Sequence, residues 1–145
     1  MLRDPSLIPL SHQHHNGLAL CVLTERELAQ DDSAHNVLRL ARRAVDRYEI
    51  ELTNHFEIEE QILFPAIPGA LTEELIAEHR RIESFIDGLR SRPTPELLRE
   101  FTSLLRSHIR REENELFESA QNQLPRATLD SLGQEIDRKA VRVCL

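Results

Sequence analysis

Two stretches of the chain share a pattern whose residue types could bind a metal ion. Residues 55–64 and 108–117 both read HxxxEExxLF, so that each copy offers a histidine and, four positions later, a pair of glutamates. Imidazole nitrogens and carboxylate oxygens together suit iron, manganese or zinc, and the lack of thiolates argues against copper(I) and iron–sulfur clusters. A repeat of this kind within one fold indicates a site with pseudo-two-fold symmetry.

Helical geometry places the first glutamate of each copy beside its histidine. Residues four apart lie on one helix face, so His55 pairs with Glu59, and His108 with Glu112. A single pair of this kind could equally be a solvated surface pair, worth about 0.2–0.5 kcal/mol. Apolar residues in phase with both pairs place them on the buried side: Leu52, Ile62 and Leu63 in one copy, Phe101, Leu105 and Leu116 in the other. Buried carboxylates that face each other are costly without a cation, so we predict a metal site.

The second glutamates and the other histidines extend this prediction. Glu60 and Glu113 lie one residue further round, and we expect them to be solvated or to support the ligands. His79 also has a glutamate, Glu83, four residues later, and we include both among the metal ligands.

The first helix offers a choice of histidines. His14 is in phase with the apolar residues Leu10, Leu18 and Cys21, whereas His15 is in phase with Ile8 and Val22. We prefer His14 as the ligand and keep His15 as the alternative. His35 is more typical of a surface residue, although it could reach the end of a bundle near His14. Tyr48 shares the stripe of His55, and we expect it to be a core residue rather than a ligand.

Helical periodicity and helix-ending residues predict the elements that would carry these ligands. We expect helices over about 10–30, with Ser11 as its cap, 33–64, 72–90 with Thr72 at its start, and 94–123. A short tail helix is expected over 126–139. Four amphipathic helices with short connections favour an all-α, antiparallel up-down four-helix bundle over about 10–124, with a tail over 125–145 and a single domain over 1–145.

Composition agrees with this class and excludes several functions. The 145 residues contain 40% hydrophobic and 30% charged side chains but only four glycines, which suits helices, and one core is expected at this length. The net charge of -7 is spread over mixed runs, so we expect no nucleic-acid partner. The chain shows neither a signal sequence nor a membrane-spanning stretch, and we expect a cytoplasmic protein without a membrane partner.

The two cysteines, Cys21 and Cys144, lie at opposite ends of the chain without CxxC spacing. This argues against a disulfide scaffold and against a thiolate zinc site. We expect Cys21 to be a small buried apolar residue.

The HxxxE repeats, His79 and the segment Leu10-Ser11-His12-Gln13-His14-His15 resemble the hemerythrin HHE cation-binding family over about residues 10–124. The resemblance implies two iron ions bridged by Glu59 and Glu112 and capped by His14, His55, His79 and His108. The oxygen-carrying branch has a histidine at the position of Glu83, and this departure argues against simple reversible oxygen carriage.

From this resemblance we expect a non-haem di-iron protein that binds or reacts with oxygen, peroxide or nitric oxide, in sensing, detoxification or iron-centre repair. Whether it is an enzyme is left open. The alternatives are an iron-responsive module that binds an unidentified protein partner, and a structural zinc-binding bundle without redox chemistry.

Overall fold

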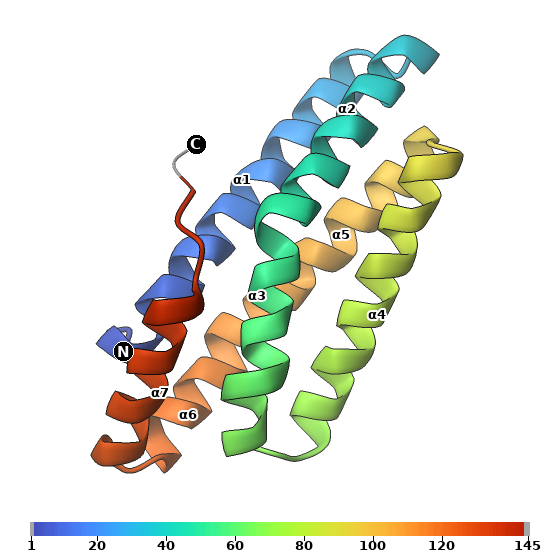
Figure 1. The fold of residues 1–145 in the computed structure, drawn as a ribbon. Coiled ribbons are helices and arrows are strands. Elements are labelled where there is room, and N and C mark those ends of the chain that lie inside the picture. Colours follow the sequence, from blue (N-terminus) through green and yellow to red (C-terminus); the bar gives the residue numbers. More distant parts are fainter. Residues whose placement is uncertain (1, 144–145) are drawn as a thin grey trace.

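The computed structural model describes residues 2–143, and these residues form helices and connecting turns without a β-strand. The long helices α1 (Ile8–Gln30), α2 (Ala34–Arg47), α4 (Ala70–Ser91) and α5 (Pro95–Arg111) lie alongside one another (Figure 1). The shorter helices are α3 (Thr53–Ile58), α6 (Phe117–Gln123) and α7 (Arg126–Lys139). The all-α class is therefore confirmed. No helix among the described residues is long and apolar enough to span a membrane.

Two of the predicted helices each consist of several consecutive helical segments. α2 continues through a π-helical turn at Tyr48–Leu52 into α3, and then through a second π-helical turn at Glu59–Leu63. α5 continues in the same way through a π-helical turn at Glu112–Leu116 into α6. The helices predicted over 33–64 and 94–123 are thus continuous helical runs with local changes of pitch.

The helix starts agree with their capping residues in two cases. The Ser33 side chain accepts a hydrogen bond from the Asn36 amide at the start of α2, and the Thr94 side chain accepts one from the Leu97 amide at the start of α5.

Two other predicted starts were wrong by two residues. α1 begins at Ile8, directly after a 3-10 turn at Pro5–Leu7, and the Ser11 hydroxyl donates to Glu113 instead of capping the helix. α4 begins at Ala70 after Gly69, whose φ of 153° suits glycine, and Thr72 donates to the Gly69 carbonyl.

Apolar residues form two separate clusters along the length of the molecule. One cluster includes Leu20 of α1, Ile82 of α4 and Leu105 of α5. The other includes Leu10 of α1, Leu75 of α4 and Leu116 after α5. The predicted ligands His14, His79 and Glu112 fall between these positions along the same helices. Apolar packing therefore closes the polar layer from both ends.

The tail helix α7 covers one end of this arrangement. It begins and ends where the sequence predicted, and Leu129 and Ile136 are buried. A Cβ atom added at Gly133 would lie 2.9 Å from the Ser6 Cα atom, so glycine permits a close approach to the 3-10 turn. The segment after α7 then runs back along α1, as Figure 1 shows. Cys21 is buried as predicted, and Cys144 lies outside the described residues.

Candidate metal centre

Six of the predicted ligands converge in the polar layer between the two apolar clusters. Their nitrogen and oxygen atoms form two groups of four, and the atoms within each group lie within 4.8 Å of one another. One group is His14, His55, Glu59 and Glu112; the other is Glu59, His79, His108 and Glu112. All six side chains are buried. Each group therefore has two imidazoles of its own, and both groups share the same two carboxylates.

Glu112 occupies the centre of this arrangement. Its Oε1 atom lies 2.7 Å from His14 Nε2 and 3.5 Å from His55 Nε2. Its Oε2 atom lies 3.2 Å from His108 Nε2 and 3.8 Å from His79 Nε2. Glu59 is placed similarly, because its Oε1 atom lies 3.2 Å from the Nε2 atoms of both His55 and His79. All four histidines therefore direct Nε2 toward the shared carboxylates.

Several buried atoms at this centre have no hydrogen-bond partner. They are His55 Nε2, His108 Nε2, Glu59 Oε2 and Glu112 Oε2. Buried polar atoms are normally satisfied, and four exceptions at one point call for an explanation. Cations placed between the imidazoles and the carboxylates would satisfy all four atoms, so the donor set fits a metal centre.

The outer nitrogen of each of these four imidazoles contacts a side chain from another helix. His14 Nδ1 lies 2.6 Å from Glu113, His79 Nδ1 2.7 Å from Glu60, and His108 Nδ1 2.7 Å from Glu78. His55 Nδ1 lies 2.9 Å from Gln13 Oε1. Such contacts orient a metal-binding histidine and fix its tautomer. The expectation that Glu60 and Glu113 support the ligands thus matches their contacts.

Gln13 and Glu78 were missed from the sequence, although each has a recognisable position. Each directly precedes one of the four converging histidines in the chain, yet contacts a histidine on a different helix. Glu60 and Glu113 have a similar position, because each directly follows one of the two shared glutamates. A side chain one residue away from an inward ligand points about 100° round the helix, toward the neighbouring helix. A polar side chain directly next to an inward-facing histidine or glutamate was therefore the available sequence signal for a supporting residue.

The shared carboxylates alter the proton affinity of the imidazoles. Burial lowers the pKa of His55, but Glu59 and Glu112 outweigh this effect and raise it from 6.5 to about 9. His108 likewise has its pKa raised to about 9, against the effect of burial, mainly by Glu112. Burial lowers the pKa of His79, but the nearby carboxylates of Glu112, Glu59 and Glu60 outweigh this effect and raise it to about 11. Despite its burial, Glu112 has a pKa well below its usual range, because His108 stabilises its charge.

The phenylalanine that ends each HxxxEExxLF copy directly follows a π-helical turn. The Phe64 amide donates to the Glu59 carbonyl and the Phe117 amide to the Glu112 carbonyl, five residues earlier. The Phe117 ring stacks on His14 at 5.2 Å, and the Phe64 ring on His79 at 5.7 Å. Each copy thus supplies a histidine and a glutamate to the candidate centre, and an aromatic ring that packs on a histidine of another helix. Changes of helical pitch are frequent at functional sites.

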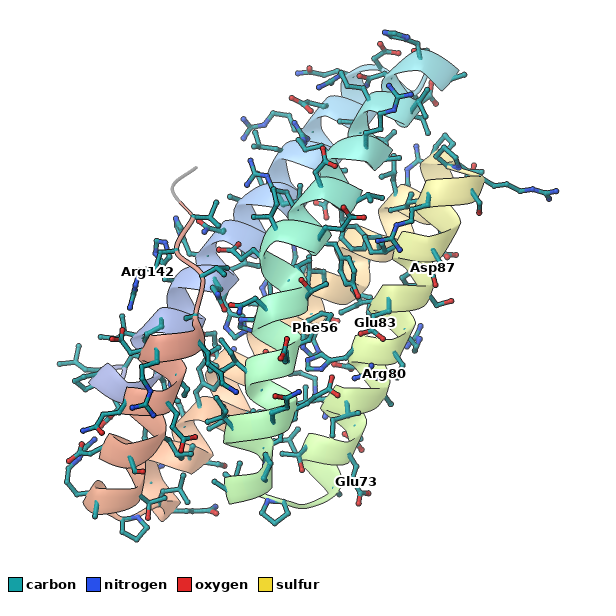
Figure 2. All side chains as sticks on the ribbon, in the orientation of Figure 1. Phe56, Glu73, Arg80, Glu83, Asp87 and Arg142 are labelled. Atoms are coloured by element: carbon teal, nitrogen blue, oxygen red, sulfur yellow. The ribbon has the colours of Figure 1, made fainter. Side chains whose placement is uncertain are left out.

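Three of the predicted ligands lie outside both groups. His15 and His35 are exposed, so that the structure brings His14 and not His15 to the centre. The Glu83 carboxylate accepts hydrogen bonds of 2.9 and 3.2 Å from Arg80 of the same helix. Figure 2 shows Arg80 and Glu83 of α4 close to Phe56 of α3.

A small hollow lies at this side of the centre, between α3 and α4. It has a volume of about 250 Å³ and its lining includes Tyr48, Phe56, Glu60, Arg80 and Glu83. The buried Phe56 ring stacks on His79 at 3.9 Å and separates the hollow from the imidazole. Tyr48 is partly buried and packs against the core, as the sequence predicted, but belongs to neither group.

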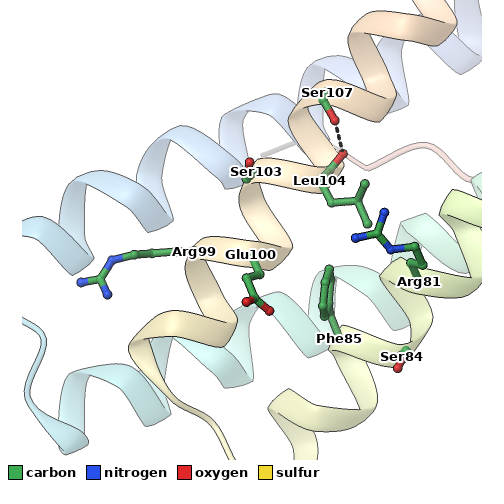
Figure 3. Close-up of a pocket in the computed structure, with 8 residues that line it drawn as sticks. All are labelled: Arg81, Ser84, Phe85, Arg99, Glu100, Ser103, Leu104 and Ser107. Atoms are coloured by element: carbon green, nitrogen blue, oxygen red, sulfur yellow. Dashed lines mark hydrogen bonds between the residues drawn. The ribbon is translucent and has the colours of Figure 1, made fainter.

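A wider groove of about 700 Å³ lies between α4 and α5 (Figure 3). Arg81, Phe85 and Glu100 are among its lining residues, and the Ser107 hydroxyl there donates to the Leu104 carbonyl at 3.1 Å. None of the six converging ligands lines this groove. We therefore assign the candidate site to the buried polar layer.

Comparison with known families agrees with this assignment. The family model described as the hemerythrin HHE cation binding domain matches residues 7–120. This range includes all six converging residues and their four supporting side chains. No curated protein and no solved structure matches the chain.

Proposed function

The chain belongs to the hemerythrin HHE cation-binding domain family, and on this premise we propose that it is a non-haem di-iron protein that binds or reacts with a small oxidant. The observation that carries the proposal is the sharing of Glu59 and Glu112 by both four-residue groups. Because a carboxylate has two oxygens, each of two shared carboxylates could bind two ions at once. A single ion would leave half of the imidazoles unused.

In the proposed centre, His14 and His55 would hold one ion, and His79 and His108 would hold the other. Glu59 and Glu112 would contribute to both positions, so that two nitrogen and two oxygen donors are available to each ion. Iron takes up to six ligands, and the pair would supply redox electrons and open coordination positions to oxygen, peroxide or nitric oxide. The preference for iron over zinc or manganese follows from the family, since the donor set suits all three.

The protein's own side chains exclude water and limit access. The ligands are at most 3% exposed, and apolar clusters close the centre at both ends. The hollow lined by Phe56 and Arg80 lies beside the centre, where the Phe56 ring separates it from His79, and its small volume favours diatomic molecules and peroxide. We therefore propose that oxidants enter between α3 and α4.

Glu83 is proposed to lie outside the coordination sphere while Arg80 holds its carboxylate. An ion at His79 and His108 would then lack the additional imidazole that oxygen carriers have at the position of Glu83. We therefore propose that the centre reacts with oxidants instead of carrying oxygen reversibly.

We also propose the antiparallel up-down bundle as the arrangement that holds the centre. It is supported by the helix contacts: α1 packs against α2 and α5, and α4 packs against the same two helices. Short connections between successive long helices favour opposite directions.

Metal analysis of the whole chain tests the function. After anaerobic reconstitution with ferrous iron and removal of excess metal, we expect two irons per chain, and exposure to air should produce ferric absorption in the near ultraviolet. His14→Gln should reduce the iron content, whereas the neighbouring exposed variant His15→Gln should retain two irons. A saturated content of one iron per chain, or a colourless protein that takes up zinc but not iron, would contradict the proposal.

A further inference from the structure

The four ligating histidines do not have equivalent supports. Three Nδ1 atoms contact a carboxylate, and an arginine binds each of these carboxylates: Arg3 binds Glu113, Arg80 binds Glu60, and Arg111 binds Glu78. The exception is His55, whose Nδ1 contacts the neutral amide of Gln13. Gln13 is 1% exposed, and among the described residues no carboxylate or arginine hydrogen-bonds to it.

Hydrogen bonds determine the orientation of the Gln13 amide. Its Nε2 donates to Asn54 Oδ1 at 2.9 Å and to the Val141 carbonyl at 3.2 Å. Both hydrogens on this nitrogen are therefore used, and a flipped amide would place its oxygen against two other oxygens. Gln13 Oε1 must face His55, so His55 Nδ1 must carry the hydrogen. When His55 gives up its other proton to bind metal, its lone pair is therefore on Nε2, which faces the shared carboxylates.

The acceptors that orient Gln13 depend on the segment after α7. The Val141 amide donates to Asn54 Oδ1 at 3.0 Å, and Asn54 Nδ2 donates to the Lys139 carbonyl at 2.9 Å. Asn16, two residues from His14, also contacts this segment, because its side chain donates to the Val143 carbonyl at 3.1 Å. The segment 139–143, which we call the C-terminal strap, is thus hydrogen-bonded directly to Gln13, the side chain that contacts His55.

We propose that Gln13 is a positioning residue that weakens the His14/His55 metal position relative to the His79/His108 position and couples it to docking of the C-terminal strap. This inference rests on the proposed two-ion centre. A carboxylate on the outer nitrogen makes an imidazole a stronger metal ligand than a neutral amide does. The His79/His108 position has two such carboxylates, whereas the His14/His55 position has one.

Strap docking selects the tautomer of His55 that binds metal. When the strap leaves, Gln13 loses an acceptor and can rotate its Nε2 toward His55 Nδ1. This orientation offers no acceptor to the Nδ1 hydrogen and disfavours the form of His55 whose Nε2 lone pair binds metal. Metal at the His14/His55 position must in turn favour the docked strap, because coupling between two binding equilibria is reciprocal.

The test is anaerobic titration of the full chain with ferrous iron, combined with hydrogen exchange at the Val141 amide. We expect two binding steps that differ by about 10–100-fold in affinity, the range typical for loss of a supporting contact. Filling of the second step should slow Val141 exchange. Gln13→Leu should weaken the second step by a similar factor and leave the first unchanged.

Two further variants separate support of His55 from docking of the strap. Gln13→Glu supplies a carboxylate to His55 but places an oxygen against the Val141 carbonyl, so it should tighten the second step while accelerating Val141 exchange. Glu78→Gln is the matched change on His108, in the other half. It should weaken the first step and leave Val141 exchange in the metal-free protein unchanged.

The outcomes distinguish this inference from the proposed function. Two irons bound with equal affinity, or equal weakening of both steps in Gln13→Leu, would overturn the inference and leave the two-ion centre intact. Val141 exchange that is insensitive to the second iron would also overturn the coupling. Two irons in both proteins, with the second bound more tightly in Gln13→Glu than in the wild type, would support the inference. One iron in both proteins would refute the two-ion function itself.

Discussion

Metal-free protein should lose stability as the pH rises from about 6.5 to 9, because its buried imidazoles bind protons more tightly when folded. The pKa of His55 is about 9 in the folded protein, against an ordinary value of 6.5. Below pH 6.5 this histidine is protonated in both states, and its ion pairs stabilise the fold fully. Between the two values the folded state binds more protons than the unfolded state, so the unfolding free energy falls as the pH rises.

The size of the effect follows from the same pKa values. A pKa of about 9 instead of 6.5 corresponds to about 3 kcal/mol for one group. His108 has a pKa of about 9 as well, so the combined loss over this range should be at least about 3 kcal/mol, although the two groups share Glu112 and are not additive. A loss of this size is a large part of the stability of an ordinary domain.

Urea unfolding with a chelator present, at pH values from 6 to 9.5, measures this loss. His55→Gln should remove part of the slope, and the exposed variant His15→Gln should leave it unchanged. Iron-loaded protein should show the opposite slope, because metal must displace protons that become weaker competitors as the pH rises. Metal-free stability that is constant or increases from pH 6.5 to 9 would refute the reasoning.

Four further predictions follow from the same geometry. Glu59→Ala or Glu112→Ala should abolish binding of two irons, whereas Glu60→Ala or Glu113→Ala should weaken binding by about 10–100-fold, as measured by iron titration; the reverse pattern would contradict the assignment of the bridging residues. Ferrous iron at 100 times its Kd should add about 2.7 kcal/mol, raising the Tm by about 5–10 °C; an unchanged Tm would mean a superficial site. Gly133→Ala should destabilise the fold by about 1–3 kcal/mol, because its Cβ would meet the Ser6 backbone, and Ser131→Ala is the exposed control in urea unfolding. Oxygen mixed with the reduced protein in stopped flow should oxidise it irreversibly, and a spectrum that reverts under vacuum would contradict this, whereas Glu83→His should move the protein toward reversible binding.

Helix content and three of the elements were predictable because their signals are local. Ser33 and Thr94 cap their helices as their positions indicated, and α7 has the predicted bounds. The start of α1 was not predictable from Ser11, since its hydroxyl contacts Glu113 from a distant part of the chain. The π-helical turns were missed because an HxxxE pattern reads identically in a helix of regular pitch.

The candidate ligands likewise differ in how far local sequence signals could predict their place in the structure. The convergence of His55, Glu59, His108 and Glu112 could be predicted from the sequence because the histidine–glutamate pair lies within one helix and occurs twice. The selection of His14 over His15 followed from the phase of its apolar neighbours. Glu83 has the same four-residue spacing from His79, yet Arg80, which no periodicity singles out, binds its carboxylate.

The sequence by itself determined the helices, the repeated histidine–glutamate pairs and the side of each helix on which these pairs lie. Only the tertiary structure decided which carboxylate supports which imidazole, and that His55 receives the amide of Gln13 where the others receive a glutamate. The physical reason is the range of the interactions. Helical phase is set by residues three or four apart, whereas each supporting contact joins residues at least 19 positions apart and depends on how the helices pack.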